Sequence, residues 1–332
     1  MTKRLATVVL GLAITAAAGA AAQEPALTKV RVGYDGFSMT SGPLNYATKK
    51  GLFKQLGLDV TPVWVEGGST LTHAVVGGSI DIAQNGYTPA AAAAVQGADI
   101  VFIGGIANKL PFQLVVKSSI TGGQQLKGQA IAISRYGSST DQAAEFALKQ
   151  LGLARNDVRI MQLGGPATRI AAALSGQIAG TVEQYPDTAE ISRHGFHVLV
   201  DLTDLAGDYP NTSYLTSRAY LKKNPDTVKR FLMAIATAIR DYKKNPVEAV
   251  KLTQAFLSIK DPADATAAYE AYLEVYPDIP RPSLAGIRLV LEQIAATEPK
   301  ARAFKAEQLI DTGPLDALER EGFFKKLLAS GP

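Results

Sequence analysis

The sequence contains no cysteine among its 332 residues. Disulfide bonds, thiolate metal sites, a nucleophilic thiol and a lipid anchor on an N-terminal cysteine are therefore excluded. Histidine is scarce, with three residues, and no HExxH or other metal-binding spacing accompanies them. No GxSxG nucleophile elbow, P-loop or GxGxxG fingerprint lies at a strand-to-helix turn. We therefore expect no metal and no cofactor, and we predict that the protein is not an enzyme.

The chain also has little net charge. Its 34 basic and 30 acidic residues give a formal charge of +4, and without Lys3 and Arg4 the balance is 32 basic against 30 acidic residues. Charges of both signs are interspersed, which does not indicate a nucleic-acid surface. We expect no nucleic-acid partner.

The N-terminus differs from the rest of the chain. Lys3 and Arg4 precede an uncharged apolar stretch that begins at Leu5, and three alanines come before Gln23. This pattern predicts a secretory signal peptide over residues 1–22. A membrane anchor is the alternative, but the stretch is short for a membrane span. Without a cysteine to carry a lipid, we expect a soluble periplasmic protein, and we expect it to be a monomer.

From residue 29 onward, short apolar strands alternate with helices. Strands are predicted at 29–34 and 58–65, with helices at 43–50 and 69–76, and the alternation continues to residue 103. This order is typical of an α/β domain with a largely parallel sheet. After about residue 204 the pattern becomes mostly helical, which predicts a C-terminal helical tail.

The same order of elements begins a second time about 95 residues later. The repeated landmarks are KQLGL at 54–58 and 149–153, GG at 67–68 and 164–165, and GxI at 78–80 and 176–178. Because the offset hardly changes, a repeated strand–helix–strand unit is the better interpretation. We predict two similar lobes, each a mainly parallel sheet flanked by helices, with a ligand bound in the cleft between them.

Small polar residues gather where the predicted strands lead into helices. In a parallel sheet these turns lie at the carboxyl ends of the strands, where ligands bind. Free backbone N–H groups and the positive ends of helix dipoles make such turns suited to anions. The candidate ligand contacts are Ser38, Thr40, Ser41, Ser69, Asn85, Gly137, Ser138, Ser139, Thr140 and Gly165.

Three consecutive hydroxyls at 138–140 can either cap a helix or contact a ligand. Ser139 precedes Gln142 by three residues, which is the spacing of a capping box. We therefore assign Ser139 mainly to the helix cap. Ser138 and Thr140 are assigned to the solute.

Charged residues adjoin the same turns. Either Arg135 or Arg169 could bind a carboxylate or sulfonate through two N–H groups, and the sequence leaves open which of them faces the cleft. Glu183, followed by Gln184, comes at the end of another predicted strand. Its carboxylate either contacts a donor on the ligand or pairs with an arginine. Arg135, Glu183 and Gln184 complete the set of candidate contacts.

Five segments carry a resemblance to a known family. They are KKGLFKQLGLDV (49–60), VEGGSTLTHAVVGGSIDIAQNG (65–86), FQLVVKSSI (112–120), LKGQAIAISRYGSSTD (126–141) and YLKKNPDTVKRFLMAI (220–235). Together they resemble the solute-binding proteins of ABC importers of the nitrate/sulfonate/taurine type, which share a fold with thiamine-pyrimidine synthases. The cysteine and histidine cluster that holds iron in those synthases has no counterpart here.

The resemblance implies a fold and a function. The fold is the type II periplasmic-binding-protein fold, with lobe 1 at 28–115 and 216–332 and lobe 2 at 116–215. Such lobes close on a small polar solute, which we expect to carry a carboxylate or sulfonate, and the closed form docks on a membrane permease. Two alternatives stay open: an enzyme of the same fold with Glu183 as general base, and a sensory protein that presents its ligand to a receptor.

Overall fold

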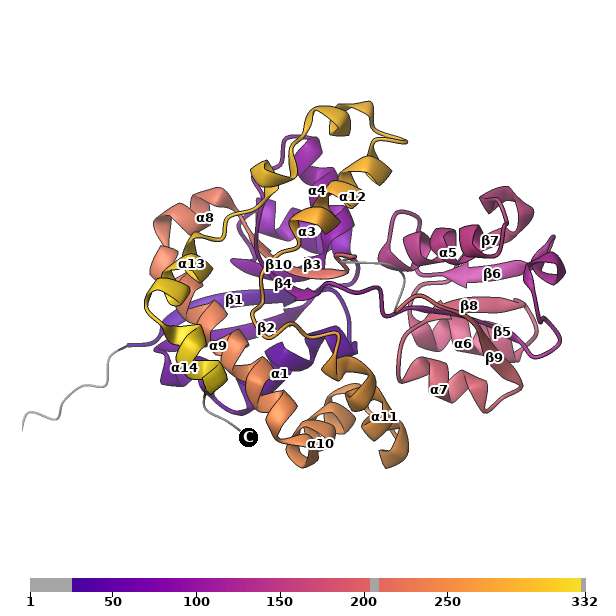
Figure 1. The fold of residues 1–332 in the computed structure, drawn as a ribbon, viewed down its shortest axis with the longest axis horizontal. Coiled ribbons are helices and arrows are strands. Elements are labelled where there is room, and N and C mark those ends of the chain that lie inside the picture. The colour runs from indigo at the N-terminus through magenta and orange to yellow at the C-terminus, as the bar shows by residue number, and fades with distance from the viewer. Residues whose placement is uncertain (1–25, 204–208, 330–332) are drawn as a thin grey trace, which may run out of the picture.

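A computed structural model describes residues 26–203 and 209–329. The predicted signal peptide at 1–22 lies outside these residues. Two five-stranded sheets, each covered by helices, form two lobes that lie side by side (Figure 1). Among the helices described, none combines the length and the hydrophobicity that a membrane span requires.

The sheet of lobe 1 has the strand order β2-β1-β3-β10-β4. Strands β1 (Thr28–Tyr34), β2 (Leu58–Trp64) and β3 (Ile82–Gly86) are parallel. Strand β10 (Thr212–Thr216) runs antiparallel between β3 and β4 (Val101–Ala107). Strand β4 is buried along its whole length, as its continuous apolar sequence predicts for a strand covered on both faces.

The sheet of lobe 2 has the equivalent order, β7-β6-β8-β5-β9. Strands β6 (Ala130–Ile133), β7 (Arg159–Gln162) and β8 (Gly180–Glu183) are parallel. Strand β5 (Gln113–Lys117) runs antiparallel between β8 and β9 (Phe196–Asp201). Each sheet thus has one strand opposed to the other four, which confirms the prediction of two similar, mainly parallel lobes.

The repeated glycines of the sequence adopt the same backbone conformation in both lobes. Gly57 and Gly152 have φ angles of 72° and 70°, and Gly78 and Gly176 have φ angles of 72° and 82°. Residues with a Cβ rarely adopt this left-handed conformation, whereas glycine does so at little cost. All four glycines lie between the end of a helix and the next strand. The sequence repeat therefore reflects glycines with the same left-handed conformation at equivalent points of the two lobes.

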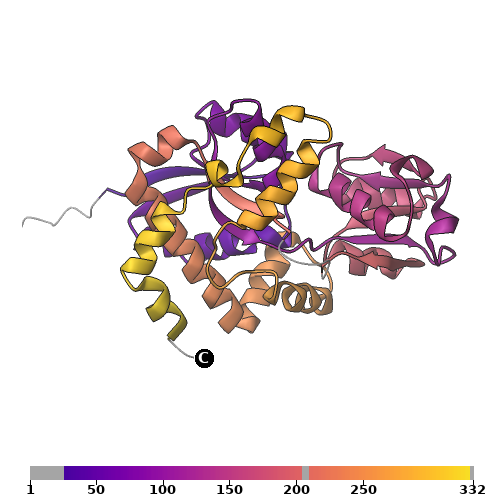
Figure 2. The same ribbon diagram turned by 45° about the horizontal axis from the view of Figure 1, so that its top comes forward.

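Helices cover both sheets, and those of the C-terminal part belong to lobe 1. Helix α9 (Pro225–Lys244) packs against α1 (Gly42–Lys49) and α13 (Gly313–Arg320), and α12 (Leu284–Ile294) packs against α4 (Tyr87–Val95). The orange and yellow helices thus surround the first lobe (Figures 1 and 2). The apolar side chains of α9 recur every three or four residues and are buried. The early helices are α1 (Gly42–Lys49), α2 (Leu52–Gln55), α3 (Gly68–Val76), α4 (Tyr87–Val95), α5 (Ser139–Gln150), α6 (Pro166–Leu174) and α7 (Asp187–Ser192). The later ones are α8 (Arg218–Lys223), α9 (Pro225–Lys244), α10 (Pro246–Leu257), α11 (Pro262–Leu273), α12 (Leu284–Ile294), α13 (Gly313–Arg320) and α14 (Phe323–Ala329).

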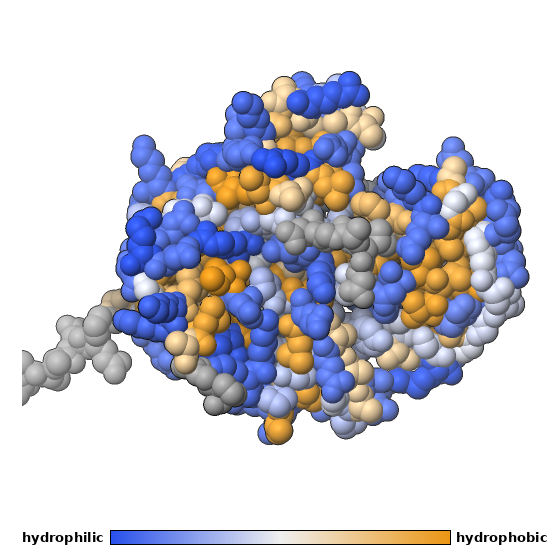
Figure 3. All heavy atoms as spheres, in the orientation of Figure 1, coloured by the Kyte–Doolittle hydropathy of each residue, from blue (hydrophilic) through white to orange (hydrophobic). Residues whose placement is uncertain are grey.

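The chain passes between the lobes twice, after β4 and again after β9. The boundaries expected at 115/116 and 215/216 therefore fall inside strands β5 and β10. Strand β10 belongs to lobe 1 because its backbone pairs with β3 and β4. A short apolar strand carries no local signal of the sheet it will join. On the face seen in Figure 3, hydrophobic side chains form separate groups among hydrophilic ones, and a furrow lies between the upper parts of the lobes.

Candidate binding cleft

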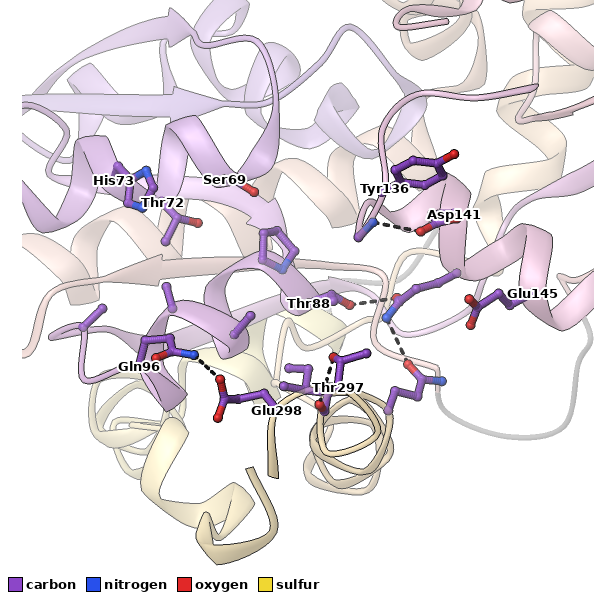
Figure 4. Close-up of a pocket in the computed structure, with 18 of the residues that line it drawn as sticks. Ser69, Thr72, His73, Thr88, Gln96, Tyr136, Asp141, Glu145, Thr297 and Glu298 are labelled. Carbon is purple, nitrogen blue, oxygen red and sulfur yellow. Dashed lines mark hydrogen bonds between the residues drawn. The ribbon is translucent and has the colours of Figure 1, made fainter. Parts of the chain in front are cut away.

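A cleft of about 980 Å³ separates α3, α4 and α12 of lobe 1 from α5 of lobe 2. Figure 4 shows Ser69 and Thr88 on one side of it and Tyr136 on the other. Of the predicted contacts, Ser69 and Gly137 lie in its lining. Gln142 of α5 crosses the cleft. Its side-chain oxygen accepts a hydrogen bond from the Thr88 hydroxyl at 2.8 Å.

The N-termini of α4 and α5 approach each other between the lobes. Gly86 precedes the first residue of α4, and a Cβ placed on it would lie 3.1 Å from Oγ of Ser139, the first residue of α5. Both helix dipoles therefore direct their positive ends toward the same space. A side chain at 86 would make a tight contact with the Ser139 hydroxyl, which would have to shift by a few tenths of an ångström.

Arg135 of lobe 2 reaches toward Glu66 of lobe 1. Its NH2 atom lies 3.6 Å from Oε1 of Glu66 in lobe 1, and the two side chains are 57% and 64% exposed. The structure therefore places the Arg135 side chain between the lobes, next to the lining residue Tyr136, whereas the sequence left its direction undecided. A long contact between two exposed charges adds little stability. The guanidinium can exchange this partner for an anion.

Arg169, the other candidate arginine, lies inside lobe 2. Its Nε donates to Oε1 of Glu183 at 2.9 Å and its NH2 donates to Oε2 at 2.6 Å. The Thr181 hydroxyl donates to Oε1 of the same carboxylate at 2.7 Å. Both side chains of the ion pair are buried, and burial raises the pKa of the Glu183 carboxyl while Arg169 opposes that rise. Of the two roles left open for Glu183, the structure shows the pairing with an arginine.

The turn at 134–141 differs from its predicted arrangement. Ser138 caps α5, because its Oγ accepts from the backbone N–H of Asp141 at 3.3 Å. The hydroxyls of Ser134, Ser138 and Thr140 lie 2.8 to 2.9 Å from one another, and Thr140 is buried. The prediction that Ser139 is the cap is wrong. The helix begins one residue earlier than the capping-box spacing implied, and Gln142, the expected box partner, bonds across the cleft instead.

The polar residues at the strand ends of lobe 1 mostly hold the turns in place. Ser41 donates to the backbone oxygen of Gly36 at 3.0 Å, and Ser38 and Thr40 share a hydrogen bond of 2.8 Å. Asn85, fully buried, donates to the backbone oxygen of Gly68 at 2.8 Å. In contrast, Ser69 is exposed beside the cleft.

In lobe 2, the strand-end residues make two kinds of contact. Arg169 NH1 donates to the backbone oxygen of Gly164, which fixes the turn that contains Gly165. Gln184 accepts a hydrogen bond from Tyr272 of α11 at 3.0 Å. This second contact joins the lobes on the side away from Gln142.

Two carboxyl groups near the strand ends were missed by reasoning from sequence. Asp35 follows β1 directly, and burial raises its pKa to about 6 although the backbone N–H of Gly86 hydrogen-bonds to it. Asp187 begins α7, and burial together with the neighbouring Glu183 raises its pKa to about 7. An Asp-Gly pair after a strand is typical of a turn. Only burial in the folded chain distinguishes Asp35 from an ordinary turn residue.

Comparison with protein families identifies the chain. A family model described as "NMT1/THI5 like" matches residues 39–249. The protein belongs to the NMT1/THI5-like family. The match begins after β1 and extends into α10, so it includes the whole sheet of lobe 2 and strands β2, β3, β4 and β10 of lobe 1.

Curated relatives of this NMT1/THI5-like chain are named as binding proteins. A putative aliphatic sulfonates-binding protein of Bacillus subtilis is 30% identical over 267 residues, which cover 77% of each chain. A putative binding protein of the same organism is 28% identical over 67% of this chain and 68% of its own. The taurine-binding periplasmic protein of Escherichia coli is 30% identical over 58% of this chain and 60% of its own.

Solved structures share the fold over nearly their whole length. A protein of Bordetella bronchiseptica has a TM-score of 0.77 and 25% identity, covering 89% of this chain and 98% of its own. The alkanesulfonate-binding protein of Xanthomonas axonopodis bound to MOPS has a TM-score of 0.70 and 22% identity, covering 87% and 99%. The fold is therefore that of the periplasmic binding proteins, as the sequence predicted.

Proposed function

We propose that this protein is the solute-binding component of an ABC importer of the sulfonate/taurine type and works in the periplasm. Its solute is a small organic molecule with a sulfonate or carboxylate group, captured between the two lobes. The observation that carries this proposal is the approach of the N-termini of α4 and α5, together with the exposed guanidinium of Arg135, which lies four residues before α5 and contacts Glu66 of lobe 1. The names of the curated relatives support it.

The positive ends of two helices and one guanidinium give this part of the cleft the electrostatics of an anion site. Unpaired backbone N–H groups at a helix N-terminus donate to anionic oxygens, and an arginine can donate two parallel hydrogen bonds. Closure of the lobes excludes water, which strengthens each of these contacts. The closed form would then be the one that the membrane permease recognises.

The arrangement of Glu183 favours binding over catalysis. A general base must reach the proton that it removes. Both carboxylate oxygens of Glu183 are already hydrogen-bonded inside lobe 2, to Arg169 and Thr181. The one residue that the sequence offered for an enzymatic role is therefore part of the lobe's interior.

Calorimetric titration and thermal unfolding test the proposal with methanesulfonate, taurine, benzenesulfonate and acetate. We expect at least one of these anions to bind and to raise the unfolding temperature, since a ligand that binds only the folded state stabilises it. Mass spectrometry of the natively purified protein should reveal a carried solute with an acidic group. A protein that binds none of these anions and carries no acidic solute contradicts the proposed function.

A further inference from the structure

Four aromatic side chains meet at the strand ends of lobe 1, and we call them the aromatic cluster: Tyr34, Phe37, Trp64 and Phe256. The ring of Phe37 lies 5.6 Å from Tyr34, 5.8 Å from Trp64 and 5.5 Å from Phe256, centroid to centroid. Phe37 and Trp64 are nevertheless 53% and 51% exposed. The cluster thus presents a half-open aromatic face.

The aromatic cluster borders the proposed anion site. Tyr34 and Trp64 are the last residues of β1 and β2, so they lie at the carboxyl edge of the parallel strands. Trp64 is two residues from Glu66, which pairs with Arg135 of lobe 2. An anion that replaces Glu66 at Arg135 would therefore have the aromatic face beside it.

Strand register gives the distance between the two parts of the site. Trp64 pairs with Tyr34, and Tyr34 pairs with Gln84, which lies two residues before Gly86 at the N-terminus of α4. Two strand spacings, roughly 10 Å, therefore separate Trp64 from Gln84, and the α4 end lies two residues beyond Gln84. A two-carbon chain cannot span that distance. A solute that contacts both parts needs a longer and apolar body.

We propose that the solute is an aryl-bearing anion, whose ring lies on the aromatic cluster while its sulfonate or carboxylate lies at Arg135 and the N-termini of α4 and α5. This inference rests on the proposed function and names the substrate class of the same cleft. Aromatic rings stack offset or edge to face at separations like those within the cluster, and each ring contact contributes about two- to tenfold in affinity.

The single tryptophan of the chain makes this inference measurable. When the protein is excited at a wavelength that tyrosine does not absorb, its fluorescence comes from Trp64 alone. We expect benzenesulfonate to change this emission. By calorimetry, we expect benzenesulfonate and naphthalenesulfonate to bind about tenfold or more tightly than methanesulfonate and taurine. The aryl group and the anion must act together, so benzyl alcohol should bind much more weakly.

Variants of the aromatic cluster separate a specific contact from a general effect. Trp64→Ala should reduce the preference for naphthalenesulfonate over methanesulfonate about tenfold, whereas Trp64→Phe should retain most of it. Val247→Ala, at a residue that is 84% exposed on α10, is the matched control and should bind like the unmodified protein. Phe37→Ala provides the same test from the loop after β1 if Trp64→Ala does not fold.

Two negative outcomes have different meanings. If methanesulfonate and naphthalenesulfonate bind equally well, and Trp64→Ala changes neither, the aryl-bearing solute is ruled out and the proposed function stands. If no anion of the panel binds, the proposed function fails and this inference fails with it. Equal binding of the two anions is also the result expected if a permease loop or lobe 2, and not the solute, covers the aromatic cluster.

Discussion

Arg169 of α6 and Glu183 of β8 form a buried ion pair with two hydrogen bonds, of 2.9 and 2.6 Å. The same guanidinium donates to the backbone oxygen of Gly164, at the turn that starts α6. One side chain therefore ties a helix, the end of a strand and a glycine turn together. The pair acts as a positioning element for the edge of lobe 2 that faces the cleft.

Breaking this pair on one side should destabilise the fold strongly. Arg169→Met leaves the Glu183 carboxylate buried without its cation, and we expect the free energy of unfolding in urea to fall by about 3–5 kcal/mol. The double variant Arg169→Met/Glu183→Leu should recover most of the loss. The control is Arg288→Met, because Arg288 and Glu307 are more than half exposed and should contribute at most about 1 kcal/mol. Equal effects at 169 and 288 would contradict the prediction.

The hydroxyls of Ser138 and Ser139 should have separable effects. Ser138→Ala removes the cap of α5 and one member of the hydroxyl cluster, so unfolding in urea should require about 1 kcal/mol less. Ser139→Ala should change stability by less than about 0.5 kcal/mol. It should weaken anion binding instead, since Ser139 lies beside Gly86 where the N-termini of α4 and α5 approach each other. The reverse pattern would restore the original assignment of Ser139 to the cap.

Arg135 and Glu66 should affect anion affinity in opposite directions. Arg135→Ala removes a charged donor, so the affinity for the best-binding sulfonate should fall about 10- to 100-fold. Glu66→Gln removes the carboxylate that competes for the same guanidinium, and affinity should rise. Titration calorimetry at low and high salt checks both, because exposed charges are screened by salt. Arg288→Ala serves as the control for a lost surface charge.

Asp35 should make the stability of the protein depend on pH. Its pKa is raised from 3.8 to about 6 in the folded chain, so the folded state retains a proton that the unfolded state has lost. The resulting stabilisation is complete below about pH 4 and is lost as the pH rises through about 6, a change of about 1–3 kcal/mol. Asp35→Asn cannot ionise and should lack this component. The test is to measure the free energy of unfolding of the unmodified protein and of Asp35→Asn at each pH. If the difference between the two free energies stays constant from pH 4 to 8, the prediction is wrong.

Local backbone chemistry made much of the fold predictable. Gly57 and Gly152 mark the same left-handed turn in both lobes, and their repetition revealed two equivalent sheets. Prolines mark the first turn of several helices, and continuous apolar runs mark the buried strands, so both kinds of element also have local signals. In contrast, the placement of β10 depends on backbone pairing with strands more than 100 residues away, which no local pattern encodes.

The candidate site was less predictable, because its geometry depends on contacts between distant segments. The sequence showed polar residues at strand ends, yet most of those hydroxyls and amides bond to neighbouring turns, as Asn85 does with Gly68. The sequence could not show which arginine is buried, because Arg169 and Glu183 are 14 residues apart in the chain and become neighbours only in the folded lobe. The aromatic cluster was missed because Phe256 is far from Phe37 in the sequence.

The position of β10 has a consequence for how the chain acquires its structure. Strand β10 separates β3 from β4 in the sheet of lobe 1, so that sheet stays incomplete until residues 212–216 are available. All strands of lobe 2 lie earlier in the chain, between residues 113 and 201. A chain that emerges N-terminus first can therefore complete its second lobe before its first. Until then, the apolar strand β4 must be kept from pairing with other chains.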